Sequence, residues 1–340
     1  MPGTVSLQPT AIPIIDFAYF GDGTSPEATE IGKQLVKACQ EVGFAYFRNT
    51  GIPQAEVDCM FEWSRRLFSL PIETKLLAPH PKEGWKNRGY SGVGREQASQ
   101  MVFDPTQLAA IRKQTPDFKE SFDIGRNNCP LISNVWLPEQ VLPGFRDAAS
   151  TFFDTCHRFE IEKLLPALSL GLELPGGGEF LGKYHQEVEN QLRLLHYPAA
   201  PAEVFARGEK GRVGAHTDYA LGTILFQDDV GGLEVESPRG SGNFVAASPI
   251  PGTVVFNIGD FLMRWSNDTL KSTLHRVCAP PNDGKLGMIK ERFSIPYFMS
   301  PDRDLLVDCL PGCWDEDTPK KYEPVTAGAY VDMRINATYS

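Results

Sequence analysis

A histidine and an aspartate stand two positions apart in the segment 214–218, which reads Gly-Ala-His-Thr-Asp. On a strand or its extended end, side chains at positions i and i+2 point the same way, so His216 and Asp218 can reach one metal ion. A motif this short also arises by chance, and Asp218 could merely cap a turn. The pair alone therefore does not establish a metal site.

A second histidine, His275, lies far enough downstream for several strands to return it beside the first pair, in the segment 271–277, Lys-Ser-Thr-Leu-His-Arg-Val. Two imidazoles and one carboxylate on one face form the ligand set of non-haem Fe(II) oxygenases, and they leave three coordination positions for a co-substrate and O₂. Zinc accepts the same ligand types, so zinc-dependent hydrolysis is a remote alternative.

Arg292 and Ser294 are again two positions apart, on a predicted strand. Their side chains should share a face. A guanidinium fork beside a hydroxyl is a good receptor for a planar carboxylate, because paired charge-assisted hydrogen bonds fix both its position and its charge. The distal carboxylate of 2-oxoglutarate would need such a receptor.

The elements that must position these residues fall into two regions. From about residue 26 to 172 the apolar residues recur mainly at helical spacing, with a short strand predicted at 44–47. The predicted helices cover residues 27–41, 54–70 and 145–170.

After the Pro-Gly-Gly-Gly run at 175–178, short β-branched and aromatic segments alternate with Gly, Pro, Asn or Asp. This spacing is typical of an antiparallel sandwich or jelly roll. The predicted strands cover residues 191–197, 223–227, 232–236, 253–258 and 292–298.

Composition excludes several classes of protein. A formal net charge of −10 argues against nucleic-acid binding, which needs clustered Lys and Arg. The seven cysteines contain no CxxC pair, so neither a disulfide framework nor a cysteine zinc site is indicated. Because we find neither a signal-like start nor a long apolar stretch, we expect a cytoplasmic protein without a membrane partner.

Together these motifs resemble the 2-oxoglutarate/Fe(II)-dependent dioxygenase superfamily, and within it the isopenicillin N synthase-like group of plant-type and fungal small-molecule oxygenases. The resemblance covers nearly the whole chain. Its further motifs lie at residues 12–17, 43–47, 68–71, 88–90 and 119–123.

The resemblance implies a mainly β fold with α elements: a double-stranded β-helix, or jelly-roll, core flanked by N-terminal and central helices. We expect three parts. They are a largely helical N-terminal region at 1–175, the jelly-roll Fe(II)/2-oxoglutarate core at 176–310, and a C-terminal extension at 311–340.

The resemblance also implies roles for particular residues. Arg292 and Ser294 would bind the distal carboxylate of 2-oxoglutarate, assisted by Tyr197 of the segment His-Tyr-Pro. Relatives often carry Asn two positions before this tyrosine, where this chain has Leu195, so the contacts to the inner carboxylate are not specified. The iron ligands that it implies are His216, Asp218 and His275.

Five further residues are candidates for a substrate pocket, although structural roles are open for each. Two fall where the family's N-terminal region approaches the cavity, two share a strand face with Tyr197, and one follows Ser294 on its expected face. They are Arg88, Tyr90, Arg193, Leu195 and Phe298.

The other histidines have no partner at metal-ligand spacing, and we predict structural or surface roles for them. His196 should point away from Tyr197 on an alternating strand. The four are His80, His157, His185 and His196.

The implied reaction hydroxylates a small organic substrate, or desaturates or cyclises it, and releases succinate and CO₂ from 2-oxoglutarate. One alternative is an iron oxidase that needs no 2-oxoglutarate, since ring-closing and ethylene-forming relatives keep the metal triad and the Arg-x-Ser motif. A catalytically silent small-molecule binding protein is another. We expect a monomer or homodimer that acts in secondary metabolism, and the sequence does not name the substrate.

Overall fold

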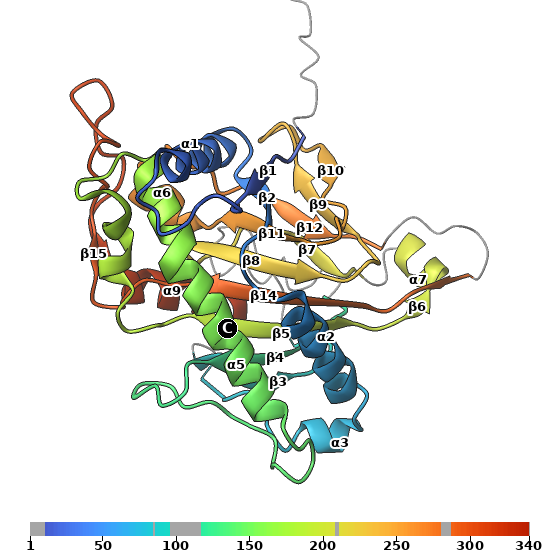
Figure 1. The fold of residues 1–340 in the computed structure, drawn as a ribbon. Helices are drawn as coiled ribbons and strands as arrows, with labels where there is room; N and C mark the ends of the chain where they lie inside the picture. The colour runs from blue at the N-terminus through green and yellow to red at the C-terminus, as the bar shows by residue number, and fades with distance from the viewer. Residues whose placement is uncertain (1–10, 84–85, 96–116, 208–210, 280–286, 340) are drawn as a thin grey trace, which may run out of the picture.

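The fold was analysed in a computed structural model, which describes residues 11–83, 86–95, 117–207, 211–279 and 287–339. Two β-sheets face each other, and helices cover the outer face of the larger one (Figure 1). This arrangement confirms the predicted jelly-roll core with flanking helices. No helix in these ranges combines the length and apolar composition that crossing a membrane requires.

The larger sheet has eight strands in the order β1-β2-β11-β8-β14-β5-β4-β3. Its pairs are antiparallel except for the parallel pair β1–β2. In that order the strands are Ile14–Asp16, Phe44–Arg48, Thr253–Ile258, Gly222–Gln227, Arg292–Met299, Gln191–Tyr197, Glu120–Gly125 and Gly89–Ser91.

The smaller sheet has four strands in the order β10-β9-β12-β7. They are Phe244–Ala246, Leu233–Glu236, His275–Val277 and Val213–His216. Two short pairs complete the described β-structure: Ala200–Pro201 (β6) with Met288–Ile289 (β13), and Leu306–Val307 (β15) with Val325–Thr326 (β16).

The helices observed agree with those predicted. They include α1 (Pro26–Glu41), α2 (Gln54–Phe68) and a long helix that begins at Phe145. α1 ends at Glu41, as predicted, and is followed by Gly43, whose φ of +80° and whose closeness to the Lys271 carbonyl exclude a side chain. The shorter helices are α3 (Ile72–Lys75), α7 (Ala202–Ala206), α8 (Asp260–Trp265) and α9 (Ala327–Tyr339).

The long helix is not uniform. It runs as α5 (Phe145–Phe159), a π-helical segment (Glu160–Leu164) and α6 (Leu165–Gly171) across the face of the larger sheet (Figure 1). Pro166 lacks the N–H that an α-helix would direct to the carbonyl of Glu162, which accounts for the widened turn just before it. The predicted helix therefore exists, with an irregularity that apolar spacing does not reveal.

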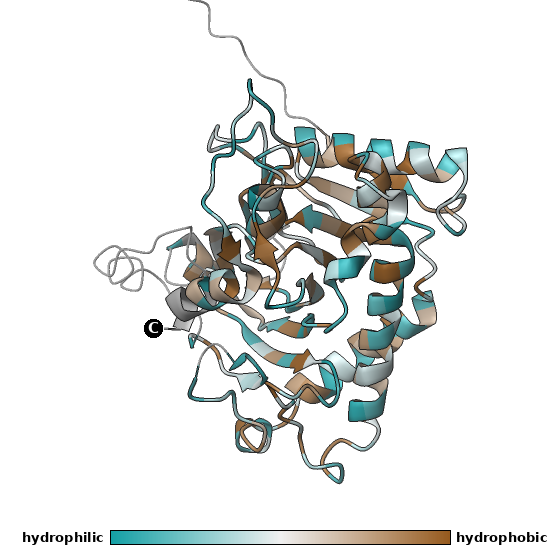
Figure 2. Cartoon of the chain, turned by 90° about the vertical axis from the view of Figure 1, so that its left-hand side faces the viewer, coloured by the Kyte–Doolittle hydropathy of each residue, from teal (hydrophilic) through white to brown (hydrophobic). Residues whose placement is uncertain are grey.

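The larger sheet is buried on both faces, as Figure 2 illustrates by the brown strands between amphipathic helices. In β2, Ala45 and Phe47 join the main core with the helices, whereas Phe44 and Tyr46 join a second cluster shared with the smaller sheet. The alternation of strand side chains thus produces two apolar layers, and the second layer surrounds the cavity.

The expectation that residues 26–172 are mainly helical missed two strands, β3 and β4, and β1, which precedes that region, was not predicted either. β1 and β3 have three residues each, too few to show a period, and every residue of β4 is buried, so its sequence does not alternate. All three strands lie in the larger sheet, which also contains strands from beyond residue 175, and β4 pairs directly with one of these, β5. The domain division at residues 175 and 310 stays a prediction.

Candidate functional site

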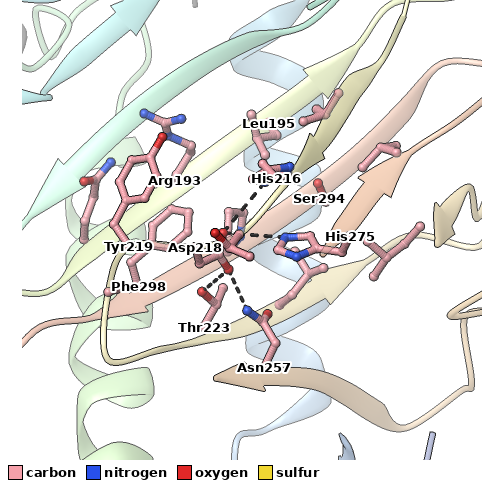
Figure 3. Close-up of a pocket in the computed structure, with 18 of the residues that line it drawn as sticks. Arg193, Leu195, His216, Asp218, Tyr219, Thr223, Asn257, His275, Ser294 and Phe298 are labelled. Carbon is pink, nitrogen blue, oxygen red and sulfur yellow. Dashed lines mark hydrogen bonds and ion pairs between the residues drawn. The ribbon is translucent and has the colours of Figure 1, made fainter. Parts of the chain in front are cut away.

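The cavity lies between the two sheets and encloses about 200 Å³. His216 ends β7, His275 begins β12, and the two residues are paired in register across these antiparallel strands. Asp218 follows His216 by two positions, and all three side chains converge on one point of the cavity wall (Figure 3). The structure thus brings together residues that the sequence separates.

The three side chains are spaced around a gap rather than bonded to one another. Asp218 Oδ1 lies 3.6 Å from Nε2 of His275 and 3.8 Å from Nε2 of His216. These distances exceed those of ordinary hydrogen bonds. The donor atoms all lie within 4.8 Å of one another, which fits a single metal ion between them.

The second ring nitrogen of each candidate histidine ligand faces a backbone carbonyl oxygen. Nδ1 of His216 lies 2.9 Å from the carbonyl oxygen of Gly214, and Nδ1 of His275 lies 3.2 Å from that of Thr273. Each Nδ1–H donates to its carbonyl, so each Nε2 carries the lone pair that a metal requires.

The carboxylate of Asp218 is oriented in the same manner. Its Oδ2 accepts hydrogen bonds from Thr223 Oγ1 at 2.6 Å and from Asn257 Nδ2 at 2.7 Å. Oδ1 is left facing the two imidazoles (Figure 3). Outer contacts of this kind fix the direction of metal ligands.

The charge states also suit a metal. Burial, together with the charge of nearby His275, lowers the pKa of His216 to about 4, so its ring is neutral at pH 7. Burial opposes ionisation of Asp218, but the nearby imidazoles of His275 and His216 and the hydrogen bond from Thr223 outweigh it and hold the pKa of Asp218 well below its usual range. A neutral imidazole and an ionised carboxylate are the metal-binding forms.

A buried arginine marks another part of the cavity wall. Arg292 is 1% exposed, its Nη1 donates to Ser294 Oγ at 3.0 Å, and its guanidinium carbon lies 5.0 Å from the centre of the Tyr197 ring. Arg292 and Tyr197 are paired in register on β14 and β5. The three residues thus form one cluster, in which Arg292 Nε has no hydrogen-bond partner among the described residues.

A second buried arginine, which sequence reasoning did not identify, lies nearby. Arg212, directly before β7, has its guanidinium carbon 5.7 Å from the centre of the Tyr197 ring. Its Nη2 donates to the carbonyl of Lys290, and burial together with the charge of Arg292 lowers the pKa of Arg212 to about 10. Positive charge is therefore concentrated here, as a carboxylate-binding region requires.

Three of the five predicted substrate-pocket residues line the cavity: Arg193, Leu195 and Phe298. Arg193 donates through Nε to Asp123 Oδ1 at 2.5 Å and through Nη2 to Asn87 Oδ1 at 2.9 Å. In Figure 3, Arg193 and Phe298 lie with Tyr219 on one side of Asp218. Tyr219 was missed, although it directly follows the His-x-Asp motif.

The other two predicted pocket residues, Arg88 and Tyr90, are not among those that line this cavity. Tyr90 is buried, and its hydroxyl donates to Glu120 Oε2 at 2.5 Å. Arg88 is also buried, and its Nη1 donates to the carbonyl of Asn87 at 2.9 Å. Their geometry therefore favours a supporting role beneath the pocket over contact with substrate.

The C-terminal helix reaches the site. Val331 of α9 lines the cavity, and Arg334 lies with its guanidinium carbon 4.4 Å from the Tyr219 ring centre. Arg334 Nη1 also lies 2.6 Å from Asp260 Oδ2, which accepts a hydrogen bond from Thr217 Oγ1 within the His-x-Asp segment. The sequence contained no signal for this contact.

Outside this site, the described residues contain no further group of three His, Cys, Asp or Glu side chains placed to hold a metal. His196 lies opposite Glu120 and Glu291, at 2.7 and 3.0 Å, and stacks on Phe293. His157 and His185 approach Glu160, and His80 Nδ1 lies 2.7 Å from the carbonyl of Pro81. These contacts agree with the structural roles predicted for the four histidines.

A jelly roll that carries two histidines and a carboxylate in its cavity, with a buried Arg-Ser pair nearby, defines a class of mononuclear non-haem iron oxygenases. Comparisons with known proteins give the same result. Residues 12–143 match the family model described as non-haem dioxygenase in morphine synthesis N-terminal, and residues 188–301 match the 2OG-Fe(II) oxygenase superfamily.

Curated fungal relatives align over almost their full length. A 2-oxoglutarate-dependent dioxygenase of Dothideomycetidae sp. (strain 11243) is 36% identical over 340 residues, covering 97% of this chain and 98% of the relative. A proline hydroxylase of Petromyces alliaceus is 36% identical over 327 residues, covering 96% and 98%.

Among solved structures, a full-length Neurospora crassa protein in complex with alpha-KG and thymine is 40% identical, with a TM-score of 0.85 and 96% of each chain covered. A 2OG-Fe(II) oxygenase family protein from Caulobacter crescentus is 28% identical, with a TM-score of 0.78, 96% of this chain covered and 99% of that one. The chain therefore belongs to the 2OG-Fe(II) oxygenase superfamily. It is a 2-oxoglutarate-dependent dioxygenase that uses iron and O₂ to oxidise a small substrate.

Proposed function

We propose that one group of cavity residues binds Fe(II) and that another binds 2-oxoglutarate. The supporting geometry is the convergence of two histidine Nε2 atoms and one aspartate Oδ1 atom on one gap. The Nδ1 atoms of the histidines and the Oδ2 atom of the aspartate are hydrogen-bonded to other groups of the protein. The proposed Fe(II) ligands are His216, Asp218 and His275, and the proposed receptor for the distal carboxylate of 2-oxoglutarate comprises Arg292, Ser294 and Tyr197.

Bound iron supplies the activation of O₂, coupled to decarboxylation of 2-oxoglutarate, that oxidises a C–H bond. The chain's own residues supply position and environment. Arg292 and Ser294 hold the far end of the co-substrate, so that its 2-oxo acid end is directed toward the triad. Tyr219 and Phe298 place the substrate on the side of Asp218 that they occupy in Figure 3, and the enclosing apolar layer limits access of water.

We further propose that the substrate is a small planar heterocycle with amide-type edges, of the pyrimidine-base class. Tyr219 and Phe298 offer aromatic surfaces, and Asn87, Gln191 and Arg193 offer hydrogen-bonding groups in the same cavity. The Neurospora crassa structure that shares 40% identity with this chain was obtained with thymine, which supports this class.

One observation favours a neutral base over a free amino acid, the alternative suggested by the proline hydroxylase relative. Asp218 is the only acidic residue among the described residues that line the cavity, and its carboxylate is a proposed metal ligand. An amino acid would bring an ammonium group into the cavity with no other carboxylate to pair with. Burying an unpaired charge is strongly unfavourable.

Turnover measurements test this assignment. Fe(II)-loaded protein and 2-oxoglutarate are supplied with thymine, uracil or L-proline, and succinate release and substrate oxidation are followed together. We expect thymine to stimulate succinate release with stoichiometric oxidation of its methyl group, and uracil, which lacks that methyl group, to give uncoupled release at most. Stimulation by L-proline alone would overturn the base assignment.

Two variants serve as controls for that measurement. Arg292→Leu should lower turnover with every substrate, because it removes the co-substrate receptor. Phe298→Leu should raise KM for thymine by about tenfold, the loss expected for one aromatic contact, while leaving the affinity for 2-oxoglutarate unchanged. Oxidation of substrate without succinate release would indicate the oxidase that needs no 2-oxoglutarate.

The remaining predictions about context rest on composition. We propose a cytoplasmic monomer or homodimer with no nucleic-acid or membrane partner. The net charge of −10 and seven cysteines that form no disulfide support this proposal. Size-exclusion chromatography with light scattering tests the oligomeric state, and fluorescent tagging in the source organism tests the location.

A further inference from the structure

The receptor for the inner carboxylate of the co-substrate is not accounted for by the residues described above. The resemblance described above leads us to expect an asparagine two positions before Tyr197, and this chain has Leu195 there. Leu195 lines the cavity but has no polar atom. A carboxylate brought into a buried cavity needs charge or hydrogen bonds in compensation, beyond what a metal contact alone supplies.

Lys119 lies on the same wall. It directly precedes β4, and continuing the observed register of Glu120 with His196 by one residue places Lys119 opposite Tyr197. The next pair on this face is Ser121 with Leu195. Lys119 is therefore a diagonal neighbour of Leu195, close enough for a long side chain to cover the leucine position.

The same row continues across the sheet, because Tyr197 is paired with Arg292 on β14. Lys119 and Arg292 thus flank Tyr197 on either side, each about 4.8 Å away from it in the hydrogen-bonding direction. Two cations in one row, on either side of a tyrosine, match a ligand that carries a carboxylate at each end.

Lys119 also lies near the triad. Its segment runs beside β7, since Phe118 N donates to the Gly211 carbonyl at 2.7 Å and Gly214 N donates to Asp117 Oδ1 at 3.4 Å. The Lys119 side chain lines the cavity with His216 and is 8% exposed.

The two other cationic residues that line the described cavity bind elsewhere. The described residues that line this cavity include three lysines or arginines: Lys119, Arg193 and Arg292. Arg292 belongs to the distal receptor, and Arg193 is held by Asp123 on the substrate side. Lys119 Nζ forms an ion pair with Asp117 Oδ2 at 3.8 Å, and its side chain also lines the cavity.

We propose that Lys119 binds the inner carboxylate of 2-oxoglutarate and replaces the amide that Leu195 does not provide. This inference rests on the proposed assignment of Arg292 to the distal carboxylate. Lys119 donates to the carboxylate end that lies beside the iron, and it fixes which end of the co-substrate faces the triad.

Equilibrium binding tests the proposal without turnover. Anaerobic Fe(II) protein is titrated with 2-oxoglutarate by calorimetry, and the visible charge-transfer band of the chelate is recorded. Lys119→Met should raise Kd by about 10- to 100-fold, the effect expected for losing one hydrogen bond to a charged group. Adding Leu195→Asn to this variant should restore most of the affinity, because the new amide can donate a hydrogen bond to the carboxylate from the neighbouring position on the same cavity wall.

A second probe separates the two carboxylates. 2-Oxopentanoate has the 2-oxo acid end but no distal carboxylate. Lys119→Met should weaken its binding as much as that of 2-oxoglutarate, whereas Arg292→Leu should weaken only 2-oxoglutarate. Unchanged 2-oxoglutarate affinity in a folded Lys119→Met protein, or a loss confined to 2-oxoglutarate, would overturn the role of Lys119.

Failure of the broader assignment would look different. If the wild-type Fe(II) protein gives no band and no binding with 2-oxoglutarate, or if Arg292→Leu binds as the wild type does, the proposed receptor itself is wrong. Thermal unfolding of each variant verifies that altered binding does not reflect loss of the fold.

Discussion

Two clusters inside this protein contain the same side-chain types, two histidines and one carboxylate. One is the triad of His216, Asp218 and His275 between the two sheets. The other lies behind the larger sheet, where Glu160 at the start of the π-helical segment contacts His157 and His185. Composition alone does not distinguish the two clusters.

The direction of the ring nitrogens does. In the Glu160 cluster, Nδ1 of His185 and Nδ1 of His157 approach the carboxylate oxygens at 3.0 and 3.3 Å. Asn190 Nδ2 donates to Glu160 Oε2 at 2.6 Å, and the Tyr297 hydroxyl does so at 3.1 Å. Both oxygens of the Glu160 carboxylate are thus approached by polar groups of the protein itself.

In the triad, both Nδ1 atoms bond to backbone carbonyls and both Nε2 atoms face Asp218 across more than 3.5 Å. The lone pairs therefore converge without satisfying one another. In a metal-binding cluster, hydrogen bonds from the surrounding protein orient each side chain and leave its ligand atom free. In a structural cluster, the side chains direct their polar atoms at one another.

Replacing His275 by Ala should have the largest effect, the loss of stoichiometric Fe(II) binding, because one of three proposed ligands is removed. The matched variant His185→Ala removes an imidazole from the Glu160 cluster and should bind iron as the wild type does. Metal analysis after anaerobic loading and desalting measures both. Full iron occupancy in His275→Ala would contradict the comparison.

Glu160→Leu should lower the free energy of unfolding by about 3 kcal/mol, since removing one member of a buried ionic cluster leaves its partners uncompensated. Denaturant unfolding measures this loss. Iron binding should persist in the folded variant, which separates stability from metal affinity. A change below about 1 kcal/mol would mean that the cluster is not ionic.

The difference in unfolding free energy between wild type and Glu160→Leu should also depend on pH, which gives a sharper test. Burial alone would raise the pKa of Glu160, but hydrogen bonds from His157 and His185 outweigh it and lower the pKa below its ordinary value. A carboxyl with a depressed native pKa stabilises the fold above its unfolded pKa, about 4.3, and loses this effect as pH falls. The difference in unfolding free energy between wild type and Glu160→Leu should therefore stay constant from pH 7 to about pH 5, and narrow as the pH falls below about 4.3 toward the native pKa of Glu160.

Asn257→Leu should have a smaller effect on the triad than loss of a ligand. It removes one of the two donors that orient Asp218, and outer contacts of this kind contribute about 10- to 100-fold in metal affinity. Competition for Fe(II) with a coloured chelator measures the change. Wild-type affinity would show that Thr223 alone is sufficient to orient the carboxylate.

His157→Ala should have the smallest effect, a loss of about 1 kcal/mol in unfolding free energy, because Glu160 keeps its contacts to His185, Asn190 and Tyr297. The same unfolding experiment measures it. A loss as large as that of Glu160→Leu would show that His157 supplies most of the compensating charge.

The sequence was informative wherever two residues of one strand act together. His216 with Asp218, and Arg292 with Ser294, were predictable because alternate strand residues share a face. Strands with clear period and turn boundaries, such as β5 and β11, were found at their observed limits.

The remainder depends on contacts between distant segments. The grouping of Glu160 with His185, the approach of Arg334 to Tyr219 and the position of Lys119 beside Tyr197 all follow from how elements pack, and no local period encodes them. β4 was missed for a related reason, since a strand buried on both faces shows no alternation.

The place of β2 in the larger sheet has a consequence for biosynthesis. Phe44–Arg48 lies between β1 and β11, and its antiparallel partner is Thr253–Asn257. The two strands are about 200 residues apart, so at roughly 5–20 residues per second a ribosome needs about 10 to 40 s to deliver the second after the first. The amino-terminal strands therefore emerge well before their neighbours exist. Nascent chains of this protein must spend that interval with a sheet edge unpaired, which makes them clients for the chaperones that bind emerging polypeptides.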